Sequence, residues 1–265
     1  MAKRNHTLII AEAGVNHNGD LATARRMVDI AAKCGADVVK FQTFGVEALV
    51  SRHARMAEYQ KENLKSDESQ RDMLSSLALS QDAFLELADY CGHVGVDFLS
   101  TPFDEASIRF LEPLQSYWKI PSGEITNYPY LVKIAETKKD VILSTGMSTM
   151  DEVDAAWKVL KAHGCGDIVL LHCTTEYPAP YDGVNLNAMH TLRARFQCEV
   201  GYSDHTSGIE IAVAAVALGA SVIEKHFTLD RGMRGPDHAA SLEPDELALL
   251  VREIRNVDTA MGNGR

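Results

Sequence analysis

The stretch Thr7–Phe44, TLIIAEAGVNHNGDLATARRMVDIAAKCGADVVKFQTF, decides the fold class. It opens with an apolar run at residues 7–13 and closes with another at 37–44, and both are short and rich in β-branched residues, as in buried strands. The intervening Leu21–Cys34 carries apolar residues at helical spacing. A strand, a helix and a second strand in this order predict two parallel strands joined by a crossover helix.

The same alternation continues to the end of the chain. Further strands are predicted at Val96–Pro102, Trp118–Ser122, Asp140–Gly146, Asp167–Thr174, Glu199–Asp204 and Ser221–Thr228. Further helices are predicted at Gln81–Val94, Glu105–Leu111, Met150–His163, Asn185–Phe196, Gly208–Leu218 and Pro244–Met261. The resulting total of eight strands is the number that closes a parallel sheet into a barrel. The sequence therefore predicts an α/β protein, a single (β/α)8 TIM barrel over residues 1–265.

An open, doubly wound sheet is the alternative arrangement of these elements. Such a sheet normally carries a GxGxxG turn after its first strand, whereas residues 14–19 read GVNHNG. One connection, residues 45–80 after the second strand, is much longer than usual. We expect it to carry a small helix of its own or to contribute to function.

Composition and charge exclude several classes of protein. The chain has 265 residues, of which 46% are hydrophobic and 24% charged, as in typical soluble globular proteins. The net charge of −11 and the lack of a dense Lys/Arg run argue against nucleic acid or an anionic membrane surface as a partner. The longest apolar run, residues 211–223, is too short to span a membrane.

The cysteines and the first residues predict a cytoplasmic protein. There are five cysteines, an odd number without CxxC spacing, which fits reduced thiols better than a disulfide framework. The N-terminal stretch MAKRNHTLIIAEAG contains only a very short apolar segment, interrupted by Glu12, so it does not resemble a signal peptide.

Polar residues end every predicted strand, and the carboxyl ends of barrel strands are where active sites are built. Lys40 and Lys119 each stand inside an apolar strand, where an ammonium group is costly to bury without an anionic partner. Ser122-Gly123 and the Ser-Thr-Gly of residues 144–146 offer hydroxyl and amide donors. Together these groups predict a seat for a phosphate or carboxylate, although a single strand-end Ser or Thr is more often just the start of a loop.

Two histidines, His205 and His226, end the seventh and eighth predicted strands. Their imidazoles can converge on one divalent metal, with Mn²⁺ or Mg²⁺ favoured over Zn²⁺ by the absence of a thiolate, or they can be purely structural. Glu12, within an apolar run, is a candidate hydrogen-bond acceptor or general base. Tyr177 and Asp237 follow the sixth and eighth strands, where each can contact a ligand or only stabilise its loop.

At these residues the chain resembles the sialic acid synthase family, whose members condense phosphoenolpyruvate with an amino sugar to make a nine-carbon nonulosonic acid. The resemblance covers nearly the whole chain. It is carried by IIAEAGVNHNGD, VKFQTF, FLSTPFD, KIPSGEITN, ILSTGM, LLHCTTEYPAPY, VGYSDHTSG, IEKHFTLD and GPDHAASLEPDEL.

The resemblance implies a role for each candidate residue. Phosphoenolpyruvate would be bound by Lys40, Thr101, Lys119, Ser122, Ser144, Thr175 and Ser203, with Thr175 at a position where some relatives have Asn. The sugar would be contacted by Glu12, Gln42, Tyr177 and Asp237, and a divalent Mn²⁺ or Mg²⁺ ion would be held by His205 and His226. The residues implied in catalysis are Glu12, Lys40, Lys119 and His226.

The implied reaction begins with attack by C3 of phosphoenolpyruvate on the sugar aldehyde. Water then adds at C2 and phosphate leaves. The stretches LIIAEAGVNHNGDL, GEITN and HCTTEYPAP are most similar to the legionaminic acid synthase branch, which uses 2,4-diacetamido-2,4,6-trideoxymannose. The alternative substrate is N-acetylmannosamine, as in N-acetylneuraminate synthases, and both reactions serve the biosynthesis of cell-surface glycans.

Members of this family usually continue past a GNG motif, here residues 262–264, into a small C-terminal antifreeze-like (SAF) domain. In their homodimers that domain lends an arginine to the partner's sugar site. Because this sequence stops at Arg265, we expect a barrel domain that binds metal and phosphoenolpyruvate but condenses the sugar poorly.

Two other functions compete with the metal-dependent synthase. One is a Schiff-base aldolase with Lys40, Lys119 or Lys225 as the nucleophile. The other is a phosphoenolpyruvate-binding barrel with little catalytic activity.

Overall fold

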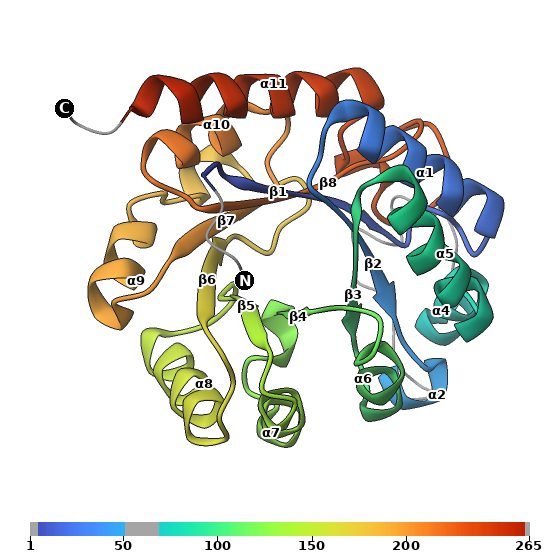
Figure 1. Cartoon of the computed structure of the whole chain (residues 1–265), viewed down its shortest axis with the longest axis horizontal. Coiled ribbons are helices and arrows are strands. Elements are labelled where there is room, and N and C mark those ends of the chain that lie inside the picture. The colour runs from blue at the N-terminus through green and yellow to red at the C-terminus, as the bar shows by residue number, and fades with distance from the viewer. Residues whose placement is uncertain (1–4, 51–68, 263–265) are drawn as a thin grey trace.

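The computed structural model describes residues 5–50 and 69–262, and these form a parallel barrel surrounded by helices (Figure 1). The eight strands are hydrogen-bonded in the order β3-β2-β1-β8-β7-β6-β5-β4. They are β1 (Leu8–Gly14), β2 (Val38–Thr43), β3 (Asp97–Pro102), β4 (Tyr117–Ile120), β5 (Asp140–Ser144), β6 (Ile168–Cys173), β7 (Val200–Asp204) and β8 (Val222–His226). All eight predicted strands are present, which confirms the α/β barrel.

The connections between the strands are helical. The α-helices are α1 (Leu21–Cys34), α2 (Val46–Leu49), α4 (Gln70–Leu77), α5 (Gln81–Val94), α6 (Glu105–Leu111), α7 (Tyr128–Glu136), α8 (Met150–Ala162), α9 (Ala188–Phe196), α10 (Glu210–Ala217) and α11 (Pro244–Met261). The short 3-10 helices are η1 (Ser122–Glu124), η2 (Tyr181–Gly183) and η3 (His238–Ala240). Among the described residues, no helix is both long and apolar enough to cross a lipid bilayer.

The first crossover shows why these residues form a helix at this place. Asp20 caps the N-terminus of α1 by accepting a hydrogen bond from the backbone N–H of Thr23. Gly35 ends the helix in the left-handed conformation, with φ of 81°, that a glycine adopts without strain. Between these caps, Ala24, Met27 and Ala31 point into the core between helix and sheet.

Helix α7 was not among the helices predicted from sequence. Its signals are nevertheless local, since Asn127 caps the N-terminus by accepting from Tyr130 N–H and a proline occupies the first turn. Tyr130, Leu131 and Ile134 then bury one face of the helix. Helices of similar length, α6 and α9, were predicted, so length does not explain the omission, and the capping signal at Asn127 is the one that would have found α7.

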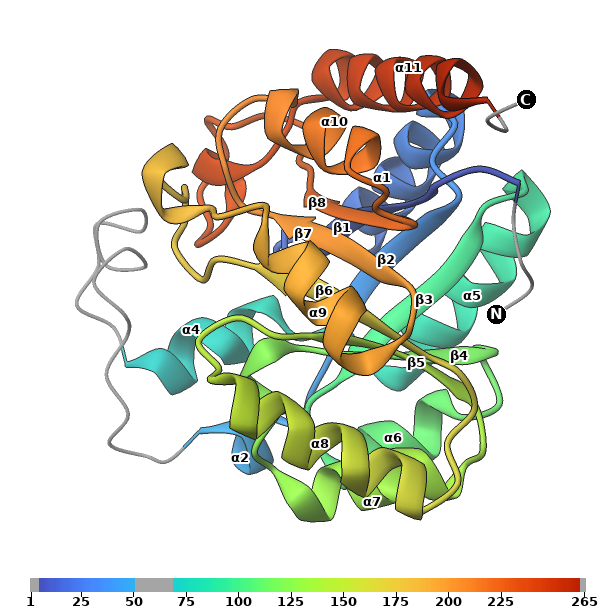
Figure 2. The same ribbon diagram turned by 90° about the vertical axis from the view of Figure 1, so that its left-hand side faces the viewer.

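The long connection after β2 carries helices, as expected. The short helix α2 lies at its start, and α4 lies at its end, where Ser69 caps the helix by accepting from Asp72 N–H at 3.1 Å. Residues 51–68 are outside the described part of the chain. Figure 2 shows α4 on the same side of the barrel as the connections that follow β6 and β8.

The two ends of the strand order, β3 and β4, lie side by side and are joined by side chains rather than by a ladder of backbone hydrogen bonds. The backbone N–H of Ser100 on β3 donates to Oε1 of Gln115, just before β4, at 2.8 Å. Tyr130 of α7 donates its hydroxyl to the Pro102 carbonyl at 2.8 Å. Gln115 and Tyr130 thus satisfy backbone groups that the missing strand pairing leaves open.

We expect Gln115→Leu to lower the free energy of unfolding by about 1–3 kcal/mol, because it leaves the buried N–H of Ser100 without an acceptor. Urea denaturation measures the change. Gln81→Leu, at an exposed position of α5, is the matched control and should change stability by less than about 0.5 kcal/mol. If the Gln115 variant is as stable as the wild type, the Gln115 side chain does not stabilise the junction between β3 and β4.

Candidate active site

The polar residues of the site occupy inward-facing positions near the carboxyl ends of the strands. Successive side chains of a strand point to opposite faces, so Leu8 and Ile10 of β1 are followed on the same face by Glu12. On β4, Lys119 follows Tyr117 in the same way. The interior of the barrel is therefore apolar toward the amino ends of the strands and charged toward their carboxyl ends.

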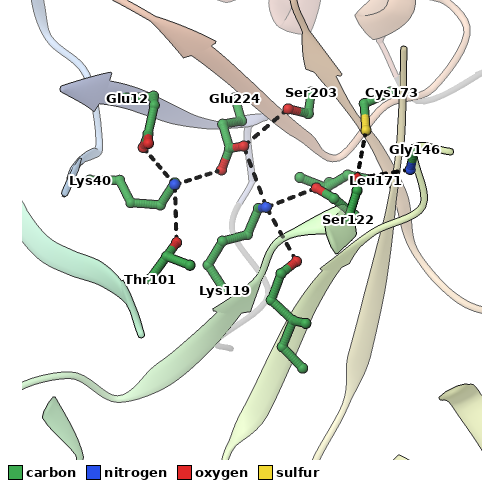
Figure 3. A network of polar contacts seen from close by, with 12 residues as sticks. Glu12, Lys40, Thr101, Lys119, Ser122, Gly146, Leu171, Cys173, Ser203 and Glu224 are labelled. Carbon is green, nitrogen blue, oxygen red and sulfur yellow. Dashed lines mark hydrogen bonds and ion pairs between the residues drawn. The ribbon is translucent and has the colours of Figure 1, made fainter. Parts of the chain in front are cut away.

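Two buried lysines and two buried glutamates form one connected network (Figure 3). Lys40 Nζ lies 2.6 Å from Glu12 Oε2 and 3.6 Å from Glu224 Oε2. On the other side, Lys119 Nζ lies 3.5 Å from Glu224 Oε1. All four side chains are at most 7% exposed, and Glu224 bridges the two ammonium groups.

Hydroxyl groups from three further strands complete this network. Lys40 Nζ donates to Thr101 Oγ1 at 3.2 Å, and Lys119 Nζ donates to Ser144 Oγ at 2.8 Å. Ser203 donates its hydroxyl to Glu224 Oε1 at 3.0 Å. The structure thus brings together five of the residues expected at the phosphoenolpyruvate site, which come from β2, β3, β4, β5 and β7.

A second group of donors lies beside Lys119. Ser122 Oγ accepts a hydrogen bond from the backbone N–H of Gly146 at 2.9 Å and lies 3.2 Å from Cys173 Sγ. Thr175 Oγ1 is buried and has no hydrogen-bond partner among the described residues. A Cβ at Gly146 would overlap this oxygen, so glycine is required where these groups converge.

Burial and mutual charge set the protonation of the network. Burial raises the pKa of Glu12 to about 7, although Lys40 opposes this. Burial also acts to raise the pKa of Glu224, but the charges of Lys119 and Lys40 outweigh it and lower the pKa to about 2. Glu224 is therefore the fixed counter-charge of the two lysines, while Glu12 can exchange a proton near neutral pH.

The two candidate metal ligands face each other at the ends of β7 and β8. The ring centroids of His205 and His226 are 5.7 Å apart, and Tyr177 packs 4.2 Å from the first and 5.9 Å from the second. His205 Nδ1 donates to the Thr174 carbonyl at 2.6 Å, which leaves Nε2 of the neutral ring as an acceptor. Burial lowers the pKa of both histidines, so both rings are neutral at pH 7.

These two imidazoles fit a divalent cation. His226 Nδ1 is buried and has no hydrogen-bond partner among the described residues, as expected of a nitrogen that meets a ligand. Within residues 5–50 and 69–262, no group of three or more His, Cys, Asp or Glu side chains is placed to hold a metal. A cation bound here would keep several positions for water or substrate, which suits a Lewis acid rather than a structural ion.

The remaining candidates line a cavity of about 150 Å³ next to His226. Gln42, Tyr177 and Asp237 contribute polar side chains to it. Gln42 Nε2 also donates to Glu12 Oε1 at 3.2 Å, which links the cavity to the charged network. Burial raises the pKa of Asp237 to about 6.

Lys225, a nucleophile candidate in the Schiff-base alternative, is not part of this network. Its ammonium group lies 2.7 Å from Asp204 Oδ2 and donates to the Thr206 carbonyl at 2.7 Å. Both polar partners precede or follow His205 directly. Lys225 therefore links β8 to the end of β7 and to the residues that follow it, and it does not face Lys40 or Lys119.

Glu224 is the important residue that was not assigned a role in the site from sequence. It is the only one of the described residues that pairs with both Lys40 and Lys119. A signal was present, because Glu224 stands in an apolar run two positions before His226 and therefore on the same face of the strand. Cys173, one of the five cysteines, is buried and contacts Ser122 in the site.

Comparisons with known proteins identify the family of this chain. The sequence model of the NeuB family matches residues 27–265. N,N'-diacetyllegionaminic acid synthase of Campylobacter jejuni is 55% identical over 97% of this chain and 78% of its own length. The synthase of the same name from Legionella pneumophila is 50% identical over 97% of this chain and 73% of its own length.

The fold comparison gives the same result. The crystal structure of N-acetylneuraminic acid (sialic acid) synthetase from Leptospira borgpetersenii serovar Hardjo-bovis, in complex with citrate, matches with a TM-score of 0.89 and 36% identity. The match covers 98% of this chain and 87% of that one. Sequence and fold together show that the chain belongs to the NeuB family.

Proposed function

We propose that this protein is a nonulosonic acid synthase that condenses phosphoenolpyruvate with 2,4-diacetamido-2,4,6-trideoxymannose and releases phosphate. The observation that carries the proposal is the pair of buried lysines, Lys40 and Lys119. Glu224 bridges their ammonium groups, and hydroxyl groups surround them (Figure 3). Two fixed ammonium groups at this spacing suit a small substrate with two anionic groups, such as a phosphate and a carboxylate.

Lys40 and Lys119 neutralise the substrate, and the hydroxyl groups orient it. Thr101 and Ser144 already accept hydrogen bonds from the lysines, and each keeps a hydroxyl proton to donate to an anion. Thr175 Oγ1, buried and without a partner among the described residues, supplies a further donor. Gln42, which lines the cavity and donates to Glu12, places this anion site next to the sugar cavity.

The reaction forms one carbon–carbon bond and breaks one bond to phosphate. C3 of phosphoenolpyruvate attacks the sugar aldehyde carbon, whose oxygen becomes a hydroxyl. The alkoxide takes up the proton released from water, and the hydroxide of that water adds to C2. The C2–O bond to phosphate then breaks, the C2 hydroxyl becomes the keto group, and its proton leaves with the phosphate. We assign to Glu12 the removal of the proton from the attacking water, because its carboxyl exchanges a proton near pH 7.

His205 and His226 would hold a divalent Mn²⁺ or Mg²⁺ ion, supported by the unpartnered His226 Nδ1. Such an ion would act as a Lewis acid that polarises the sugar aldehyde. Tyr177 packs against both imidazole rings and keeps them in place. Gln42, Tyr177 and Asp237 would bind the hydroxyl and amide groups of the open-chain sugar.

The choice of sugar rests on the two relatives named as N,N'-diacetyllegionaminic acid synthases, at 55% and 50% identity. The solved sialic acid synthetase is more distant, at 36% identity. The same proposal includes a reducing compartment, the cytoplasm, which is supported by five cysteines that are all free. It also includes a homodimer, which the family resemblance implies.

Phosphate release from phosphoenolpyruvate tests the proposed function. The protein is assayed with Mn²⁺ and either the diacetamido sugar or N-acetylmannosamine, each with and without a chelator. We expect phosphate release that requires both metal and sugar and is faster with the diacetamido sugar. Release that survives the chelator, or a lysine adduct with pyruvate trapped by borohydride, would contradict the metal-dependent reaction and favour the Schiff-base aldolase.

A further inference from the structure

Helix α4 forms an apolar wall along one side of the sugar cavity. Met73, Leu74 and Leu77 line the cavity from the same face of this helix. Met73 and Leu77 are buried and pack with Val15, from the connection after β1, in an apolar cluster separate from the main core. We call these three α4 residues the α4 wall.

The position of the α4 wall is fixed by a close contact with Gly19. A Cβ at Gly19 would overlap the carbonyl oxygen of Ser76 on α4, and Gly19 has a φ of 72°. Only glycine allows this backbone conformation and this approach without strain. The Gly19 of the NHNGD stretch, to which no role was assigned from sequence, thus sets the distance between α4 and the barrel.

Outside α4 the cavity lining is mostly polar, with Val15 and Pro236 as its apolar members. Gln42, Tyr177, His226 and Asp237 are its polar members, so an occupant meets hydrogen-bonding groups from the barrel and three apolar side chains from the α4 wall. A hydroxyl or phosphate group placed against the wall would lose its water and gain no partner. A methyl group placed there would be favoured by its removal from water.

We propose that the α4 wall is the specificity determinant of this cavity and binds a methyl group of the amino sugar. The inference rests on the proposed function in assuming that the cavity holds the sugar. Among the candidate sugars, a methyl group is present at C6 of a 6-deoxy sugar and in each acetamido group. We assign the C6 methyl to the wall, because a C6 hydroxyl or phosphate is the group that this surface would reject.

The test uses Leu74→Asn, which places an amide on the wall at a position that is only partly buried. Leu85→Asn, on the exposed side of α5, is the matched control. Three sugars are compared: N-acetylmannosamine, 2-acetamido-2,6-dideoxymannose and 2,4-diacetamido-2,4,6-trideoxymannose. For each protein, kcat/KM is measured by phosphate release, and saturation-transfer NMR identifies which sugar protons contact the protein.

We expect Leu74→Asn to lower the ratio of kcat/KM for 2-acetamido-2,6-dideoxymannose to that for N-acetylmannosamine by about tenfold, with no change for Leu85→Asn. Leu74→Asn could instead lower the ratio of kcat/KM for the diacetamido sugar to that for the monoacetamido 6-deoxy sugar. That result would overturn the assignment to C6 and place an acetamido methyl group against the wall. A uniform loss with all three sugars would mean that α4 is only structural.

The NMR measurement separates this inference from the proposed function. We expect the C6 methyl protons to be saturated more strongly than the ring protons in the wild type, and less so in Leu74→Asn. If the C6 methyl protons are saturated in this way but no phosphate is released, the synthase activity is refuted and the contact between the C6 methyl group and the α4 wall is supported. If the C6 methyl protons are no more saturated than the ring protons, the α4 wall does not bind the methyl group, whether or not phosphate is released.

Gly19→Ala provides an independent variant, because it displaces α4 without changing any residue of the cavity. We expect Gly19→Ala to lower the ratio of kcat/KM for 2-acetamido-2,6-dideoxymannose to that for N-acetylmannosamine, as Leu74→Asn does. KM for phosphoenolpyruvate should stay within about twofold of the wild type. A loss confined to phosphoenolpyruvate binding would contradict the proposed role of Gly19 in positioning the wall.

Discussion

Lys40→Met is expected to lower kcat/KM for phosphoenolpyruvate by roughly a thousandfold. The Lys40 ammonium group lies 2.6 Å from Glu12 and donates to Thr101, and its side chain is 5% exposed. Truncating one partner of a buried charge pair at a binding site costs about 4 kcal/mol of binding, which corresponds to roughly a thousandfold in kcat/KM. Steady-state phosphate release with varied phosphoenolpyruvate at saturating Mn²⁺ and sugar measures the effect.

Lys158→Met is the matched control for this prediction. Lys158 is 74% exposed and pairs with Asp154 one turn earlier on α8, far from the charged network in the sequence, so its loss should leave kcat/KM unchanged. Thermal unfolding of both variants shows whether the Lys40 variant is folded at the assay temperature. A folded Lys40→Met protein with activity within tenfold of the wild type would contradict the role given to the lysine pair.

Glu12→Gln is expected to lower kcat by about 100- to 10,000-fold and to change the pH profile. Burial raises the pKa of Glu12 to about 7, so the carboxyl is protonated below that pH and ionised above it. If the carboxylate removes a proton from water, kcat/KM rises with pH up to about 7 and then levels off. The glutamine variant has no titrating group at this position and should lose this acid limb.

The histidines do not produce the same limb, because burial lowers the pKa of His205 and His226 below the usual value. The profile is measured from pH 5.5 to 9 at saturating Mn²⁺, with Asp82→Asn, at an exposed position of α5, as the control. An acid limb that persists in Glu12→Gln would assign the titration to another group. Activity that falls as the pH rises through 7 would make Glu12 an acid rather than a base.

Much of the candidate site was accessible to sequence reasoning because barrel geometry is regular. Strand ends could be placed from apolar runs, and in a (β/α)8 barrel these ends converge on one face. Lys40 and Lys119 stood out because a lysine within an apolar strand requires a partner. The identity of that partner did not follow, since Glu224 is distant in the chain from both lysines.

The α4 wall shows a different limit of the sequence. Met73, Leu74 and Leu77 have the spacing of any buried helix face, which predicts packing and not a ligand. Their place beside the cavity depends on the contact between Gly19 and Ser76, which are 57 positions apart (76 − 19). Nothing local in either segment specifies that contact.

The sequence by itself determined the alternation of strands and helices, the number of strands and the polar residues that end each strand. These are local properties, set by side-chain periodicity, capping residues and the cost of burying charge. Only the tertiary structure decided that Glu224 bridges the two lysines, that Lys225 pairs with Asp204, and that α4 closes one side of the cavity. Those contacts join residues on different elements, and their distances are set by how the barrel closes and packs.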